Sequence, residues 1–171
     1  MRRIVLFIAT SLDGYIAGKD GNTDWLFTEG DYGYKDFYKS IDTTLMGHNT
    51  FEYITQFGRF PYSNKENYVF SRKKRDPGIF PVEFVFGDVA EFTEKLKARK
   101  GKNIWLVGGG QINSILLNAN LIDRMIISIH PVALGQGIPL FKDESLKKLQ
   151  FNLVKHEVFK KGLVQLTYDN S

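Results

Sequence analysis

Residues 104–112 read Ile-Trp-Leu-Val-Gly-Gly-Gly-Gln-Ile, an apolar run that passes into three consecutive glycines and then into a helical pattern. A strand, a glycine turn and a helix start in this order let a backbone approach a diphosphate, because glycine has no side chain and the helix start offers free N–H groups. The run lacks the GxGxxG spacing of the doubly wound folds. It therefore predicts either a phosphate-binding turn or a tight turn that needs glycine only for its positive φ.

Two further strand ends repeat this arrangement. Residues 45–50, Leu-Met-Gly-His-Asn-Thr, place a glycine and a hydroxyl at a strand-to-helix junction, where Asn49 or Thr50 can also serve only as a helix cap. Residues 69–72, Val-Phe-Ser-Arg, end another strand with a hydroxyl and a guanidinium, and arginine can bind a phosphate through two hydrogen bonds. Three such ends predict one crevice for a phosphate-rich cofactor.

Strand and helix patterns alternate along the chain and predict an α/β layered fold. Strands are expected over 3–10, 43–46, 67–70, 83–86, 104–107 and 125–129, and helices over 32–40, from Asn49, from Asp88 and from about Ile112. Residues 151–154 and 164–168 alternate in polarity on either side of a turn at 160–162, which predicts an antiparallel hairpin. We expect residues 1–171 to form a single domain.

Composition narrows the classes of function. The chain has 171 residues, 43% of them hydrophobic and 25% charged, which suits a folded domain with a substantial core. It has no cysteine, and its three histidines lack ligand spacing, so we expect no disulfide, thiolate or metal chemistry. The net charge of +4 favours anionic ligands, but the basic residues are spread out and indicate no nucleic-acid partner. The apolar run at 4–9 is too short for a membrane span or a signal peptide, so we expect a cytoplasmic protein with no membrane partner.

Three segments in order resemble the dihydrofolate reductase superfamily: residues 9–17 (Ala-Thr-Ser-Leu-Asp-Gly-Tyr-Ile-Ala), 45–52 and 107–112. The resemblance covers nearly the whole chain. It is closest to the branch that contains the reductase domain of the bifunctional riboflavin-biosynthesis deaminase-reductase, whose late-strand loop is similar to residues 131–141. This resemblance implies a three-layer fold, with a mixed, mainly parallel sheet of about eight strands, an antiparallel C-terminal hairpin and helices on both faces.

The resemblance also implies NADPH as the hydride donor. Carried over by position, Ala9 and Ile16 would flank the nicotinamide beside a mobile loop around residues 20–22, and a cis peptide bond would join Gly108 to Gly109. The residues expected at the phosphates and the adenosine are Gly47, Thr50, Ser71, Arg72, Gly109, Gly110, Gln111 and Ile112.

One position departs from the family pattern. The family usually has an arginine where this chain has His48, and a histidine is mostly neutral at pH 7 and is a weaker partner for the 2′-phosphate of the adenosine. We expect Arg72, helped by Lys73 or Lys74, to take over that contact. NADPH is therefore the expected cofactor, and NADH stays open.

The substrate side is less well defined. Asp31, with Asp36 about one helical turn later, lies near the position of the acid that binds the pteridine in dihydrofolate reductases, but can equally be a solvated residue at a helix start. Trp25 can line the substrate mouth or pack within its own loop. Asp13 is expected to fix the turn into Gly14.

Three functions follow from these observations. The first is an NADPH-dependent reductase of the riboflavin-pathway type, similar to 5-amino-6-(5-phosphoribosylamino)uracil reductase, which transfers hydride to a C=N or C=O of a small heterocycle. The second is a dihydrofolate or other pteridine reductase, and the third is a cofactor-binding protein without turnover. By analogy with the riboflavin branch we also expect a homodimer, with exposed aromatic surface near Trp105 or Phe141.

Overall fold

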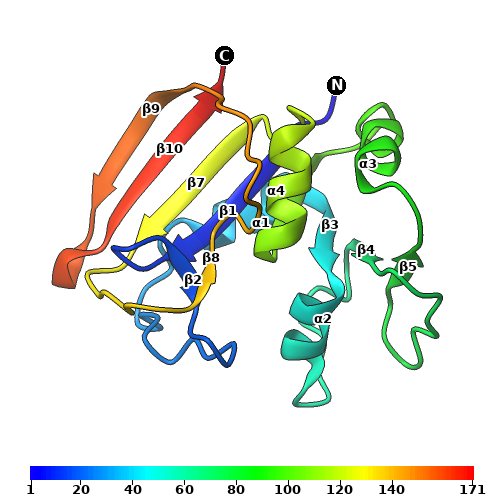
Figure 1. Cartoon of the computed structure of the whole chain (residues 1–171), viewed down its shortest axis with the longest axis horizontal. Helices are drawn as coiled ribbons and strands as arrows, with labels where there is room; N and C mark the ends of the chain where they lie inside the picture. Colours follow the sequence, from blue (N-terminus) through cyan, green and yellow to red (C-terminus); the bar gives the residue numbers. More distant parts are fainter.

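The computed structural model describes residues 1–171 and is built on an eight-stranded sheet with the order β5-β4-β3-β6-β1-β7-β10-β9 (Figure 1). The first six strands in this order run parallel, and β10 runs antiparallel to both of its neighbours. The sheet strands are β1 (Ile4–Thr10), β3 (Ile41–Gly47), β4 (Glu66–Phe70), β5 (Glu83–Val85), β6 (Asn103–Gly108), β7 (Arg124–Ile129), β9 (Phe151–Val158) and β10 (Val164–Asn170).

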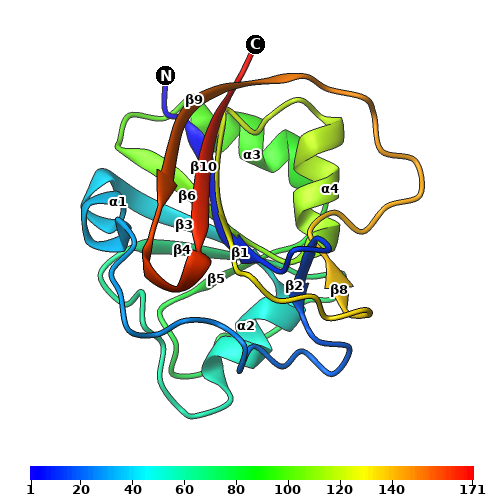
Figure 2. The same ribbon diagram turned by 90° about the vertical axis from the view of Figure 1, so that its left-hand side faces the viewer.

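Helices cover both faces of this sheet (Figure 2). The helices are α1 (Tyr34–Ser40), α2 (His48–Thr55), α3 (Val89–Lys97) and α4 (Gly110–Asn118). Residues from α3 and α4 pack in one hydrophobic cluster, and residues from α1 and α2 pack in a second. No helix is both long enough and apolar enough to cross a membrane. The predicted three-layer, mainly parallel fold with its C-terminal hairpin is therefore confirmed.

Strand β1 shows why the sheet needs cover on both sides. Ile4 and Leu6 are fully buried in the cluster with α4, whereas Val5 is buried in the cluster with α1 and α2. Successive side chains of a strand point to opposite faces, so an uninterrupted apolar run is stable only between two layers. This is the physical basis for the strand predicted at 3–10.

Two of the predicted helix starts lie at other residues in the structure, and a third, at Asp88, is confirmed. The helix predicted over 32–40 begins at Tyr34, because Gly33 adopts a left-handed conformation with φ of 78°. Asn49 does not cap α2: the helix begins at His48 directly after Gly47, without a side-chain cap. Asp88 does cap α3, since its side chain accepts the Glu91 N–H at 2.8 Å.

A second, two-stranded sheet joins β2 (Tyr15–Ala17) to β8 (Ile138–Pro139), and the sequence patterns do not predict it. Gly137 allows this pairing, because a Cβ there would collide with the carbonyl oxygen of Ala17. The small sheet holds the segment before residue 141 near the turn that follows β1.

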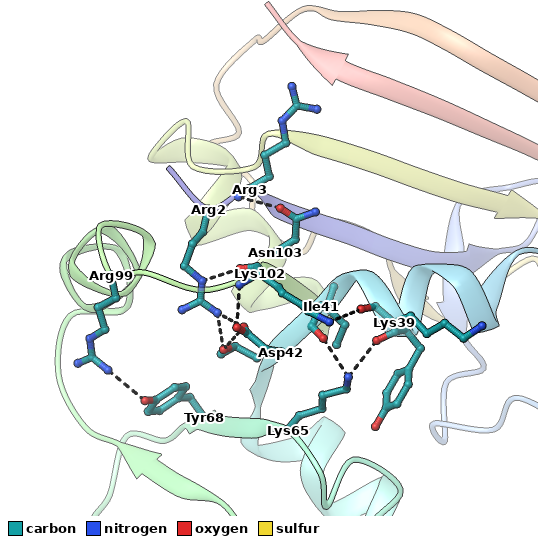
Figure 3. A network of polar contacts seen from close by, with 12 residues as sticks. Arg2, Arg3, Lys39, Ile41, Asp42, Lys65, Tyr68, Arg99, Lys102 and Asn103 are labelled. Carbon is teal, nitrogen blue, oxygen red and sulfur yellow. Dashed lines mark hydrogen bonds and ion pairs between the residues drawn. The ribbon is translucent and has the colours of Figure 1, made fainter.

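The amino-terminal starts of three sheet strands are joined by a buried guanidinium (Figure 3). Arg2 donates to the Lys102 carbonyl oxygen at 2.6 Å, to the Thr43 hydroxyl at 2.5 Å and to the Asp42 carboxylate. Asp42 also accepts the Lys102 N–H at 2.7 Å. This cluster, which we call the Arg2 network, links β1, β3 and β6 at the end of the sheet opposite the predicted crevice.

Candidate functional site

The carboxyl ends of β3, β4 and β6 meet at one edge of the sheet. Gly47 pairs with Phe70 on β4, and Met46 pairs with Gly108 on β6. A Cβ at Gly47 would lie 3.1 Å from Cγ1 of Ile112, so the first turn of α4 is in direct reach of the β3 end. The three predicted strand ends, at Gly47, Ser71 and Gly109, therefore lie side by side.

A hydrogen bond connects two of these strand ends. The Gly109 N–H donates to the Thr50 hydroxyl at 3.1 Å, which ties the glycine run to the first turn of α2. Helices α2 and α4 both begin at this edge, and the first N–H groups of a helix have no partner inside it. The edge therefore presents two sets of backbone donors at the positive ends of two helices, an arrangement that suits anionic phosphate.

The three consecutive glycines have three different surroundings. Gly108 is buried and has a φ of 120°, and Gly109 is half-buried beside Thr50. Gly110 is buried against the segment from Pro139 to Lys142: its carbonyl accepts the Lys142 N–H at 3.0 Å, and a Cβ there would collide with the Pro139 carbonyl oxygen. Gly110 is therefore glycine because of packing.

The cis peptide bond expected between Gly108 and Gly109 is absent, since the chain contains no cis peptide bond. The positive φ of Gly108, which is open to glycine, turns the chain here. Beyond the glycines, Gln111 is exposed and Ile112 is buried. Of the residues predicted at the diphosphate, Gly109 and Gln111 are thus the ones at the surface.

The β4 end carries the densest basic run of the chain. The Ser71 hydroxyl accepts the Lys73 N–H at 3.3 Å and a hydrogen bond from Arg75 Nε at 3.2 Å. Arg72 is exposed and makes no hydrogen bond or ion pair within the chain. Arg75 thus supports Ser71, and Arg72 is free to contact a ligand.

His48 is engaged within its own helix. Its Nε2 lies 3.3 Å from Oε1 of Glu52, and its ring packs 6.2 Å from the ring of Phe84, measured between centroids. A carboxylate beside His48 opposes a second anion at the same place. The geometry therefore favours Arg72 over His48 as the partner for any phosphate on the adenosine side.

The residues predicted at the nicotinamide lie beside a turn that is tied down by Asp13. Ala9 on β1 and Ile16 on β2 are both half-buried. Asp13 accepts the hydroxyl of Ser11, the first residue of the turn that ends at Gly14, at 2.6 Å, and the backbone N–H groups of Leu134 and Gly135 at 3.1 and 2.7 Å. The contact with Ser11 agrees with the predicted role of Asp13 in the turn into Gly14, whereas the two contacts with the late loop were not predicted.

Hydrogen bonds from Ser11, Leu134 and Gly135 outweigh the small desolvation of Asp13 and lower the pKa of its carboxyl group to about 2. A lowered pKa means that ionised Asp13 stabilises the fold above its ordinary value of 3.8, and that this contribution is lost as the pH falls through about 2. We expect Asp13→Asn to lower the melting temperature at pH 7, and the difference from the unmodified protein to shrink near pH 2. Thermal unfolding at both pH values measures this.

Asp36→Asn is the matched control for that comparison, since Asp36 is an exposed carboxylate whose ion pair with Lys39 is 3.7 Å long. Its melting temperature should stay close to that of the unmodified protein at both pH values. An Asp13→Asn protein that melts like the control at pH 7 would show that Asp13 does not hold the late loop.

The candidate substrate residues separate in the structure. Asp31 is exposed and accepts the Lys35 N–H at 3.2 Å, which is the role of a residue at a helix start. Trp25 is half-buried, and its ring stands edge-on to the ring of His130, with centroids 5.5 Å apart. Sequence reasoning missed His130. The signal that could have found it is a histidine placed directly after a buried strand and before Pro131.

Two of the hollows in the surface lie outside the three strand ends. One of about 490 Å³ opens between residues 18–20 and the late-loop residues Leu134 and Gln136, next to the loop expected to be mobile. The other, of about 560 Å³, lies over the starts of β1 and β7 between α1 and the C-terminal hairpin. Neither hollow includes Gly47, Ser71 or Gly109, and the feature of those strand ends that suits a cofactor is the set of converging backbone donors.

Residues 2–165 match the model of the RibD C-terminal domain. The chain belongs to the RibD C-terminal domain family. The uncharacterized protein YwjB of Bacillus subtilis (strain 168) is 42% identical over 146 residues, which cover 83% of this chain and 84% of YwjB. Membership of the RibD C-terminal domain family confirms the resemblance found in the sequence.

Solved structures of similar proteins have the same fold as this chain. The crystal structure of a candidate riboflavin biosynthesis protein from Shewanella sp. PV-4 is 36% identical, with a TM-score of 0.86 over 100% of this chain and 99% of that one. A diaminohydroxyphosphoribosylaminopyrimidine deaminase/5-amino-6-(5-phosphoribosylamino)uracil reductase from Thermotoga maritima is 17% identical, with a TM-score of 0.73, and matches 99% of this chain and 57% of its own length. At that identity the Thermotoga structure supports the RibD C-terminal fold alone.

Proposed function

We propose that this protein is a reductase that uses NADPH to transfer a hydride to a C=N or C=O of a small pyrimidine or pterin-like heterocycle. The observation that carries the proposal is the convergence of Gly47, Ser71 and Gly109 at one sheet edge, where two helices begin. Membership of the RibD C-terminal domain family supports the reductase class. We infer that residues 1–171 act as one domain in the cytoplasm.

Residues at the three strand ends would contact different parts of the cofactor. Gly47, Thr50, Gly109 and Gln111 would hold the diphosphate, and Ser71 with Arg72 would contact the adenosine side. Ala9 and Ile16 would flank the nicotinamide, which supplies a hydride when the cofactor is bound. Trp25 would line the substrate, whereas Asp31 contributes to the start of α1.

Titration with NADPH and NADH, followed by protein fluorescence, tests this assignment. Arg72→Ala should weaken NADPH binding by roughly tenfold to a hundredfold, because a hydrogen bond to a charged phosphate contributes about 1.5–3 kcal/mol, and should leave NADH binding nearly unchanged. His48→Arg should strengthen NADPH binding. The matched control is Lys100→Ala, which removes an exposed positive charge before β6, at the other end of the sheet.

Equal effects of Arg72→Ala and Lys100→Ala on NADPH would remove Arg72 from the site, and no binding of either dinucleotide would refute the reductase. Oxidation of NADPH by dihydrofolate, blocked by an antifolate, would favour a pteridine reductase instead. Tight NADPH binding without turnover of any pterin or aminopyrimidine would favour a binding protein.

We also propose a homodimer, and the surface through which its two copies would pair differs from the one expected from the sequence. Trp105 is 6% exposed and lies in the core, so the expectation of exposed aromatic surface there is wrong, and Phe141 is half-buried against the cluster that contains α3 and α4. Strand β9 instead forms a free sheet edge with exposed Leu153, Val154 and Val158. An unpaired apolar edge favours pairing with another chain, and light scattering would distinguish a dimer from a monomer of 19.6 kDa.

A further inference from the structure

Two aromatic rings with unpaired polar atoms meet where β1 and β7 end. His130 follows β7 and donates its backbone N–H to the Thr10 carbonyl oxygen at 2.8 Å. The residue is 3% exposed, and the rings of Trp25 and Phe27 stand against its imidazole, with centroid distances of 5.5 and 5.0 Å. This group, which we call the Trp25–His130 pair, lies at the end of β1 that carries Ala9, the residue assigned to the nicotinamide.

The hydrogen-bonding state of His130 follows from its neighbours. Its Nδ1 lies 3.2 Å from the carbonyl oxygen of Ser128, which can only accept, so Nδ1 carries the proton and Nε2 presents a lone pair. Burial lowers the pKa of His130 and outweighs the hydrogen bond to Ser128, which keeps the ring neutral near pH 7.

The two polar atoms of the pair have no partner in the chain. Nε2 of His130 and Nε1 of Trp25 are both buried and make no hydrogen bond. One is an acceptor and the other is a donor, and an unpaired buried group costs about 1–3 kcal/mol. Such a cost is expected where a group is kept for a ligand rather than for the fold.

The rest of the site holds this acceptor rigidly. The Gln165 amide donates to the Ser128 hydroxyl and to the Tyr32 carbonyl oxygen, both at 3.0 Å, and so joins β7, β10 and the segment before α1. Lys161 also pairs with Glu29 at 2.5 Å, but both side chains are more than half exposed, so this ion pair restrains the segment that carries Trp25 only weakly. Entry of a ring between Trp25 and His130 requires this segment to move outward.

We infer that Trp25 and His130 bind the amide edge of the substrate ring, with the ring N–H donating to His130 Nε2 and the ring C=O accepting from Trp25 Nε1. This inference rests on the proposed function. A neutral donor–acceptor pair between aromatic walls matches a planar lactam, as in pyrimidines and pterins. It does not match a carboxylate or a phosphate, because neither has a proton for Nε2.

The test uses ¹⁵N-labelled protein saturated with NADPH and titrated with 5-aminouracil. The Trp25 indole N–H signal, assigned from Trp25→Phe, should shift with 5-aminouracil. The Trp105 indole, which donates to the Phe7 carbonyl oxygen at 3.1 Å, should not shift and serves as an internal control. 1,3-Dimethyluracil has the same ring without N–H groups and should leave both signals in place.

Two substitutions separate the atoms of the pair. His130→Asn keeps an N–H for Ser128 but is too short to place an acceptor at the position of Nε2, and Trp25→Phe keeps an aromatic ring and removes the donor. Each should weaken 5-aminouracil binding by roughly tenfold, because each leaves one group of the ligand unpaired. His156→Asn, on exposed β9, should have no effect. NADPH affinity should be the same in all of these proteins.

The inference is overturned if 5-aminouracil does not move the Trp25 signal, if 1,3-dimethyluracil moves it equally, or if both substitutions leave the affinity unchanged. Failure of the proposed function looks different. In that case the unmodified protein does not bind NADPH, whereas 5-aminouracil alone still shifts the Trp25 indole.

Discussion

Replacing Gly110 with alanine is expected to destabilise the protein by about 1–3 kcal/mol, the usual cost of overfilling a packed interior. Gly110 begins α4, and alanine in a helix is intrinsically better than glycine by about 1 kcal/mol, so propensity alone predicts a gain in stability. The added Cβ would, however, meet the Pro139 carbonyl oxygen and lie 3.2 Å from Cβ of Lys142. The segment from Pro139 to Lys142 would have to move away from the helix.

Urea and thermal unfolding measure this effect, and Gln111→Ala is the control, since Gln111 is the exposed neighbour on the same helix turn. The NADPH affinity of Gly110→Ala, compared with that of the unmodified protein at a temperature where both are folded, gives a second readout. Loss of stability in Gly110→Ala supports the packing role. Unchanged stability with weaker NADPH binding would instead assign Gly110 to the phosphates.

The layers of the fold are readable from the sequence because they depend on local patterns. An uninterrupted apolar run at 4–9 predicts a strand covered on both faces, and Asp88 followed by Glu91 predicts a capped helix. The pairing of β2 with β8 is not readable, since these strands have three and two residues. Their pairing depends on contacts from Asp13 and Gly137 to segments distant in the sequence.

The sequence likewise predicts one part of the candidate site and misses another. Parallel strands end at one edge of a sheet, so the convergence of Gly47, Ser71 and Gly109 follows from predicting the strands. The meeting of Trp25 with His130 does not follow, because a loop of irregular structure brings Trp25 across the ends of β1 and β7. The role of Arg75 beside Ser71 is likewise set by the turn between them.

The Arg2 network places the most strongly buried charge of the sheet at the end that has no part in the proposed chemistry. The Arg2 side chain is 3% exposed, whereas that of Asp42 is 39% exposed. Arg2→Met should therefore destabilise the protein by roughly 2–3 kcal/mol, somewhat below the 3–5 kcal/mol for breaking a fully buried pair, because Asp42 stays partly hydrated. The measurement is the free energy of unfolding in urea, and NADPH binding should be unchanged.

The effect of pH on the stability of Arg2→Met follows from the pKa of Asp42. Burial raises the pKa of Asp42, but the Lys102 N–H, the Thr43 hydroxyl and the Arg2 guanidinium together lower it below the ordinary 3.8. Ionised Asp42 thus stabilises the fold above pH 3.8. The difference in the free energy of unfolding between Arg2→Met and the unmodified protein should therefore decrease as the pH falls below that value. Arg3→Met is the matched control, because Arg3 is 54% exposed and lies 3.7 Å from Asp169, a geometry that contributes about 0–1 kcal/mol. The loss of unfolding free energy in Arg2→Met could instead be no larger than the loss in Arg3→Met, or could stay constant as the pH falls below 3.8. Either result would mean that packing of the Arg2 side chain, and not its charge, joins the three strands.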